Sequence, residues 1–173
     1  MVQDISSANT ISEIDPDCFR TILRSAAASV VVITTCADGE LHGMTATAFS
    51  SVSADPPSVL IVVNRTTRSH SRLLRSGRFA INVLAEDQEW IGQRFAGKIE
   101  DQFSGVGHIA TAEGLPVLTG CAAHMECRTQ ETVDVGTHTI FVGRVVAGKA
   151  EPAAPLLYHD GRFKALAPSR EAS

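Results

Sequence analysis

The sequence predicts a mainly β protein, a small antiparallel barrel with two or three flanking helices. Strand-like segments outnumber helical ones, and the connections between them are short enough for hairpins instead of βαβ units. With 173 residues and no internal repeat or long linker, the chain is expected to form one domain. We place that domain at residues 16–168, between an N-terminal arm (1–15) and a C-terminal tail (169–173).

Charge and hydropathy exclude several classes of partner. The formal net charge of −4 argues against nucleic acid or an anionic membrane as the main partner. No apolar run approaches the roughly 18 residues that a membrane-spanning helix needs. The first residues carry acids and lack the apolar core of a signal peptide, so a cytoplasmic protein is expected.

The chain opens with a helix and a hairpin. Asp15 can cap a helix that has Pro16 in its first turn. Five apolar residues follow at the spacing of one helical face: Phe19, Ile22, Leu23, Ala26 and Ala27. The β-branched run from residue 30 to 35 predicts a strand, and the Ala-Asp-Gly-Glu sequence at 37–40 predicts a hairpin turn. The first two strands should therefore be antiparallel neighbours.

The stretch from His42 to Asn64 carries the main functional signal. Residues 45–48 (Thr-Ala-Thr-Ala) are small, which is unusual for a strand and suits a flat group lying against the backbone. Ser50, Ser51 and Ser53 offer hydroxyls for anionic oxygens. A turn at residues 55–57 leads into an apolar strand at 58–63. These features predict one wall of a cofactor site, although close packing of two barrel strands explains the composition equally well.

A short helix ended by Gly77 is expected next. Arg68, Arg72 and Arg75 share one side of it, and a solvated face is the simplest explanation. Alternatively, arginines near the end of the preceding strand hold phosphates. The hydroxyl and helix N-terminal donors available for the same anion are those of Thr66, Thr67 and Ser69, beside Arg65 and Arg68.

The second half reads as further strands around one helix. A strand is expected at 78–84, a helix at 86–95 and a mobile polar surface loop at 96–107. Gly105-Val-Gly107 is not a dinucleotide fingerprint, because no apolar strand precedes it and no third glycine follows. Long strands at 121–133 and 138–148 and a short pair at 156–158 and 162–166 complete the chain.

The sequence contains no clear metal site or catalytic dyad. The four cysteines lack a Cys-x-x-Cys pair, and His124 with Cys127 falls short of the three or four ligands of a zinc site. All four cysteines are therefore expected to be ordinary thiols.

Five segments in order resemble the short-chain flavin reductase family: VVVITT, GMTATAFSSVSADPP, FAINVL, GTHTIFVGRV and LLYHDGRFKAL. The resemblance covers roughly residues 16–168. That family includes the small reductase components of two-component aromatic monooxygenases. The resemblance implies an antiparallel split β-barrel of the FMN-binding type, a homodimer, FAD or FMN as the flavin, and NADH as reductant.

The resemblance also assigns roles to individual residues. It places Thr45, Ala46, Thr47 and Ala48 against the isoalloxazine, and Ser50 and Ser51 at the phosphates. The second side of the phosphate site would comprise Asn64, Thr66, Thr67 and Arg68, and the distal part of the flavin would meet Phe95 and Lys98. His138 and Tyr158 are assigned to NADH. The family's acidic residue before the histidine is replaced here, since the motif reads Gly136-Thr137-His138.

The implied reaction needs no catalytic side chain. Hydride passes from NADH to flavin, and the two cofactors carry the chemistry. The reduced flavin would then leave for a separate oxygenase. The alternative is a flavin-binding split-barrel protein that serves electron transfer or sensing without turning over NADH.

Overall fold

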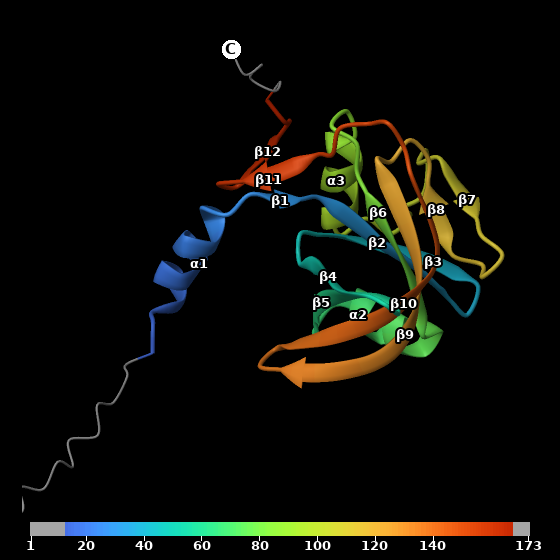
Figure 1. The fold of residues 1–173 in the computed structure, drawn as a ribbon, viewed down its shortest axis with the longest axis horizontal. Helices are drawn as coiled ribbons and strands as arrows, with labels where there is room; N and C mark the ends of the chain where they lie inside the picture. Colours follow the sequence, from blue (N-terminus) through green and yellow to red (C-terminus); the bar gives the residue numbers. More distant parts are fainter. Residues whose placement is uncertain (1–12, 168–173) are drawn as a thin grey trace, which may run out of the picture.

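A computed structural model describes residues 13–167 of the chain (Figure 1). Most of the predicted arm (1–15) and all of the predicted tail (169–173) lie outside the described residues. Antiparallel strands dominate the described chain, with three helices beside them, so the mainly β prediction is confirmed. Within residues 13–167, none of the helices has both the length and the apolar character needed to cross a membrane.

One curled sheet of seven strands organises the molecule, in the order β3-β2-β6-β9-β10-β5-β4. Every pair in it is antiparallel. The strands are β2 (Val31–Ala37), β3 (Glu40–Ala46), β4 (Phe49–Ala54), β5 (Pro57–Asn64), β6 (Arg78–Val83), β9 (Ala123–Val135) and β10 (His138–Ala150). The edge strands β3 and β4 are consecutive in the chain, and no ladder joins them in the described structure. The sheet therefore curls without closing through backbone pairing.

The concave side of the sheet holds the main core. Phe79 and Phe141, from β6 and β10, are fully buried there beside Ile33 of β2. Helix α2 (Arg68–Ser76) contributes Leu73 to the same cluster. Burying a large apolar side chain stabilises a fold by about 1.5–3 kcal/mol, so α2 is anchored mainly through this leucine.

Helix α3 (Glu89–Ala96) covers the other face of β2 and β3. Ile91 and Phe95 pack there against Val32 in a second apolar cluster. The helix approaches β3 closely at Gly43, where an added Cβ would lie 2.5 Å from a Phe95 ring carbon. Only a residue without a side chain lets the helix lie this near the edge strand.

Local sequence signals explain most helix ends and turns. Asp15 accepts hydrogen bonds from the first-turn amides of α1 (Pro16–Arg24), as predicted. Thr67 caps α2, and Gly77 ends it in the left-handed conformation. Asp38 and Gly39 both have positive φ, which matches the predicted tight hairpin between β2 and β3.

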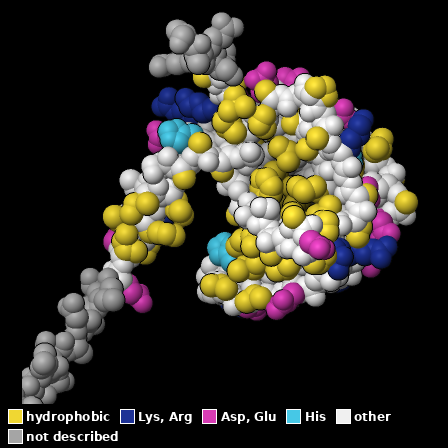
Figure 2. Space-filling model, in the orientation of Figure 1, with side chains coloured by type: hydrophobic (Ala, Val, Ile, Leu, Met, Phe, Trp, Pro, Cys, Tyr) yellow, Lys and Arg dark blue, Asp and Glu magenta, His cyan; other side chains and the backbone are white. Residues whose placement is uncertain are grey.

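Helix α1 stands away from the curled sheet (Figures 1 and 2). All its residues are exposed, including the apolar face predicted to be buried. Phe19, Ile22 and Leu23 are 49%, 54% and 55% exposed. The helix is therefore confirmed over Pro16–Arg24, but Ala26 and Ala27 of the predicted face lie beyond its end, and the expected burial is absent from the described chain.

Two small sheets flank the main one. The first has the order β1-β11-β12, with β11 (Leu157–His159) between β1 (Ala28–Ser29) and β12 (Arg162–Lys164), and its β11–β12 hairpin lies close to the predicted C-terminal pair. The second, β7 (His108–Ala110) with β8 (Pro116–Leu118), was not predicted. The expectation of a surface loop at 96–107 is wrong in part, since Gln102 and Val106 are buried.

Candidate functional site

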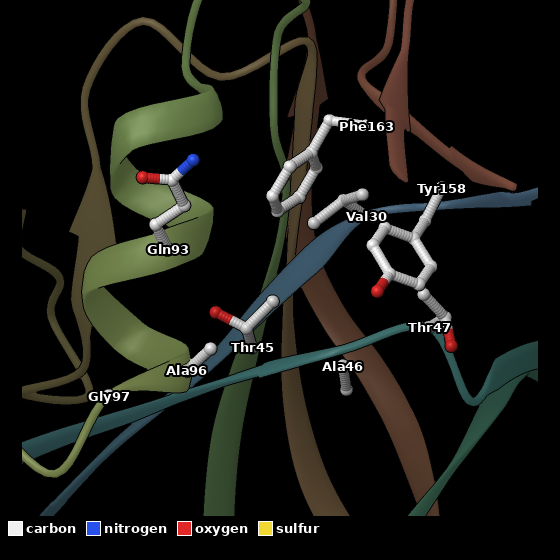
Figure 3. A pocket seen from close by; sticks show the side chains of 9 residues that line it. All are labelled: Val30, Thr45, Ala46, Thr47, Gln93, Ala96, Gly97, Tyr158 and Phe163. Carbon is white, nitrogen blue, oxygen red and sulfur yellow. The ribbon is translucent and has the colours of Figure 1, made fainter. Parts of the chain in front are cut away.

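Edge strand β3 runs along the floor of two adjoining cavities. The first has a volume of ≈ 530 Å³ and lies between β3, α3 and the C-terminal hairpin (Figure 3). Its lining residues are Val30, Thr45, Ala46, Thr47, Gln93, Ala96, Gly97, Tyr158 and Phe163. The second, of ≈ 830 Å³, continues along β3 toward the start of α2 and shares Thr45, Ala96 and Gly97 with the first.

The first cavity is lined mainly by apolar and small side chains. Its β3 wall carries only small side chains, and Tyr158 and Phe163 stand opposite with ring centroids 5.3 Å apart. Thr45 donates its hydroxyl hydrogen bond to the Gly92 carbonyl over 2.6 Å. That hydroxyl therefore fixes α3 against β3 and is not a free donor to the cavity.

Ala46 borders the cavity with its backbone and not with its methyl group. Its side chain packs against the core of the curled sheet, and Figure 3 shows it pointing away from Gln93 and Phe163. Successive residues of a strand face opposite sides, so Thr45 and Ala46 cannot both present side chains to one ligand. The predicted small-residue wall is present, but alternate residues form it.

The second cavity lies at the N-terminus of α2 and is cationic in net charge, because Arg68 and Lys98 outnumber its one carboxylate, Glu100. Thr66, Thr67 and Arg68 line one side of it, and Lys98 lines the other. Asn64 does not line this cavity; its side-chain oxygen accepts hydrogen bonds from the Thr66 amide and hydroxyl, both at 2.9 Å. A helix N-terminus with basic side chains attracts anions, so this cavity is suited to phosphate.

His42 is a buried residue of the second cavity that the sequence analysis did not assign. Its Nε2 lies 2.8 Å from the Ser69 hydroxyl oxygen. Burial, with the positive charges of Arg72 and Arg68, lowers the pKa of His42 from 6.5 to about 4. The imidazole is therefore neutral at pH 7, and the positive charge of the cavity comes from arginine and lysine.

Arg94 of α3 holds the loop that carries Lys98. Its guanidinium donates to the backbone oxygens of Gln102 and Asp101, both over 2.7 Å. The buried Gln102 side chain in turn accepts a hydrogen bond from the Gly43 amide of β3 over 3.3 Å. These bonds tie the loop to α3 and to β3, so the loop forms a built wall of the second cavity.

The structure brings most of the predicted site residues together. Thr45, Ala46, Thr47 and Tyr158 line the first cavity, and Ala48 lies with Tyr158 in a neighbouring hollow. The predicted residues that line the second cavity are Thr66, Thr67, Arg68, Phe95 and Lys98.

Besides Asn64 and Ala48, described above, three further predicted residues line neither cavity. Ser50 and Ser51 lie exposed on β4, paired with Leu60 and Val59 of β5. His138 opens β10 opposite Asn64 and is partly buried, with Nδ1 3.0 Å from the Thr137 hydroxyl. None of the three is among the residues lining the two cavities. Their assigned roles remain predictions.

The wall opposite β3 contains residues that the sequence analysis missed. Gln93, Ala96 and Gly97 come from one side of α3 and its end, and Phe163 comes from the C-terminal hairpin. The spacing of Gln93 and Ala96, three apart on a helix, placed them on a common face. Nothing in the sequence indicated that this face lies toward β3.

Comparisons with known proteins identify the family of the chain. The family model described as "Flavin reductase like domain" matches residues 23–167. The chain is 36% identical to the reductase subunit HsaB of a flavin-dependent monooxygenase from Rhodococcus jostii, over 91% of this chain and 81% of that protein. It is 40% identical to the reductase component of an FADH(2)-dependent resorcinol hydroxylase from Rhizobium sp., over 87% of each chain.

A solved structure shows the same fold. The NADH:FAD oxidoreductase SgcE6 of Streptomyces globisporus, in complex with NAD and FAD fragments, superposes with a TM-score of 0.86 and 35% identity. The match covers 92% of this chain and 99% of that one. With a family model spanning most of its length and relatives above 30% identity, this chain belongs to the flavin reductase-like domain family.

Proposed function

We propose that this protein is an NADH-dependent flavin reductase that transfers hydride to FAD or FMN and supplies reduced flavin to a separate monooxygenase. The observation that carries the proposal is the pair of adjoining cavities along β3. One is lined mainly by apolar and small groups, and the other has a net positive lining with Arg68, Lys98 and one carboxylate, Glu100. A flavin joins a planar ring system to phosphate in the same order, and the relatives named above are reductases or reductase components.

The residues present suit the binding of a flavin. The small side chains of β3 leave room for a ring system to lie against the strand, with Tyr158 opposite. Arg68, Lys98 and the amides that begin α2 are suited to the phosphate. Bound flavin and NADH supply the hydride acceptor and donor, so the protein's contribution is to hold the rings in contact and exclude water.

We assign Tyr158 and His138 to NADH. Tyr158 supports the assignment because it borders both the first cavity and the adjoining hollow, where a second ring can approach the flavin. His138 rests on the family motif at residues 136–138. It opens β10 and lines neither cavity nor the adjoining hollow, so its contact with NADH requires a second copy of the chain or a movement of the strand.

A homodimer of split barrels, located in the cytoplasm, completes the proposal. The sheet curls, and β3 and β4 are not paired with each other within the described residues. The apolar face of α1 and the exposed Val133 and Val135 at the end of β9 offer surface for a second copy. A mass near twice 18.4 kDa in light scattering would support the dimer, and a mass of 18.4 kDa would refute it.

Steady-state kinetics test the reaction itself. We expect the purified protein to oxidise NADH, followed by loss of its absorbance, only when FAD or FMN is added. NADH should be used better than NADPH, because Arg24 is the one arginine or lysine among the described residues that line the first cavity and the hollow beside it, and a 2′-phosphate would need more positive charge. Tight flavin binding without NADH oxidation would instead favour the electron-transfer or sensor alternative.

A further inference from the structure

We propose that Asp134 is a positioning residue for the reaction: through a hydrogen-bonded network it fixes the turn that carries His138 to the start of α2. The inference rests on the proposed function, in which His138 serves NADH and the start of α2 serves the flavin. The network consists of Arg65, His70, Asp134 and Thr139, and we call it the hairpin network.

The tip of the β9–β10 hairpin extends past the end of β5 (Figure 1). His138 lies opposite Asn64, the last residue of β5. Neither β5 nor β6 pairs with residues 135–137 within the described chain, and Val135 is 56% exposed. A two-stranded hairpin is only marginally stable alone, so further contacts are needed to hold this tip in one position.

Arg65 binds the turn from the loop that follows β5. Its amide donates to the Thr137 carbonyl over 3.0 Å, and its Nη2 donates to the Gly136 carbonyl over 2.6 Å. Its Nη1 lies 3.3 Å from Oδ2 of Asp134, whose side chain is 61% exposed. Such an exposed ion pair contributes little alone, so the importance of Asp134 depends on its other partner.

That partner is Thr139, which is 2% exposed and directly opposite Asp134 in the hairpin. Its hydroxyl donates to Asp134 Oδ1 over 2.5 Å, and His70 Nε2 lies 2.8 Å from the same hydroxyl oxygen. Because the single hydroxyl hydrogen goes to the carboxylate, His70 must donate through Nε2. The His70 ring also packs edge-on against Phe141, with ring centroids 5.7 Å apart. A directed chain of hydrogen bonds therefore joins α2 to the hairpin.

Asp134 is the member of the network that accepts from both sides. The hydrogen bond from Thr139, with the positive charge of Arg65, lowers the pKa of Asp134 below its ordinary value. An ionised carboxylate has only acceptors, so its two oxygens can receive both donors at once. An asparagine has the same shape but presents a donor in place of one oxygen, so it cannot replace both bonds.

Anchoring Thr139 also sets the direction of His138. Successive residues of a strand face opposite sides, so a fixed Thr139 on the inner face holds His138 on the other face. The side chain of His138 has one hydrogen-bond contact among the described residues, to the Thr137 hydroxyl of the same turn. Its position therefore depends on that of the turn.

The start of α2 is held independently of the hairpin network. The Asn64 side chain accepts hydrogen bonds from the Thr66 amide and hydroxyl, both at 2.9 Å. The Asn64 backbone oxygen accepts from the amide and hydroxyl of Thr67, at 3.1 and 2.8 Å. Breaking the network should therefore displace His138 and leave the flavin side nearly unchanged.

Removing the Thr139 hydroxyl is the first test. Thr139→Val keeps the shape of the side chain and breaks both hydrogen bonds, whereas Thr139→Ser keeps the hydroxyl. We expect Thr139→Val to raise the KM for NADH about tenfold at saturating FMN, because groups in one hydrogen-bond network are strongly coupled. The affinity for FMN should change by less than about twofold, and Thr139→Ser should retain the wild-type KM. Asp134→Asn, at an exposed position that the fold tolerates, should raise the KM as Thr139→Val does.

A double variant separates positioning from general support of the fold. If Asp134 acts through His138, Asp134→Asn should raise the KM for NADH in the wild-type background and have no further effect in His138→Ala. The matched control is Asp38→Asn, since Asp38 is another hairpin aspartate paired with an arginine, Arg75, at 3.5 Å. It should leave both the KM and the FMN affinity unchanged.

Several results would overturn the inference. A wild-type KM in Asp134→Asn and Thr139→Val would do so, as would a wild-type KM in His138→Ala. Additive effects of Asp134→Asn and His138→Ala, an equal rise in Asp38→Asn, or an equal loss of FMN affinity would show general support of the fold instead. Failure of the wild-type protein to oxidise NADH with any flavin would refute the proposed function itself.

Discussion

Ala96→Leu should weaken flavin binding by about tenfold to a hundredfold while the protein still folds. Ala96 is the exposed last residue of α3 and lines the first and second cavities where they meet. Leucine is a good helix former, so the helix should tolerate it. Its branched side chain would occupy the groove between the ring and the phosphate. Forcing extra bulk into an occupied space costs about 1–3 kcal/mol, and 1.4 kcal/mol is tenfold in affinity.

The measurement is a flavin titration of the folded variant, with circular dichroism to confirm its fold. Ala112→Leu is the matched control, because Ala112 is an exposed alanine in the turn between β7 and β8. It should bind flavin as the wild type does. An Ala96→Leu protein with wild-type affinity would show that the flavin does not lie in this groove.

Arg68→Gln should weaken FAD and FMN by about tenfold to a hundredfold and leave riboflavin unaffected. Arg68 is the first residue of α2 and lines the cationic cavity beside Thr66 and Thr67. Hydrogen bonds to charged groups contribute about 1.5–3 kcal/mol, and riboflavin has no phosphate with which to form them. Comparing the three flavins thus isolates the phosphate contact from ring binding.

Arg75→Gln is the control for loss of charge on the same helix. Arg75 lies in the last turn of α2 and pairs with Asp38 at 3.5 Å, and it lines neither of the two cavities. It should change the affinity for none of the three flavins. If Arg68→Gln weakened riboflavin as much as FAD, Arg68 would be supporting the fold of the site and not meeting phosphate.

Local signals in the sequence were sufficient for much of the fold. The cap at Asp15, the turn at Asp38 and Gly39 and the stop at Gly77 each depend on a few neighbouring residues, and each was predicted. Periodicity also identified the long β9 and β10 hairpin. The short strands β7 and β8 were missed because three residues are too few to show an alternating pattern.

Side-chain direction and long-range packing were harder to predict. The chain leaves β3 after Ala46 and re-enters the sheet at Phe49 on its other edge, so the stretch predicted as one wall divides into two strands. Ser50 and Ser51 follow β4 away from the cavities as a result. The opposite wall depends on α3 approaching β3 at Gly43, a tertiary contact that no local pattern specifies.

A crystal structure of the protein with FAD would test the central claim most directly. The account predicts the isoalloxazine on β3 between Thr45 and Tyr158, and phosphate oxygens within hydrogen-bond distance of Arg68 or Lys98. A flavin whose phosphates lie on Ser50 and Ser51 of β4, with the groove along β3 empty, would contradict it.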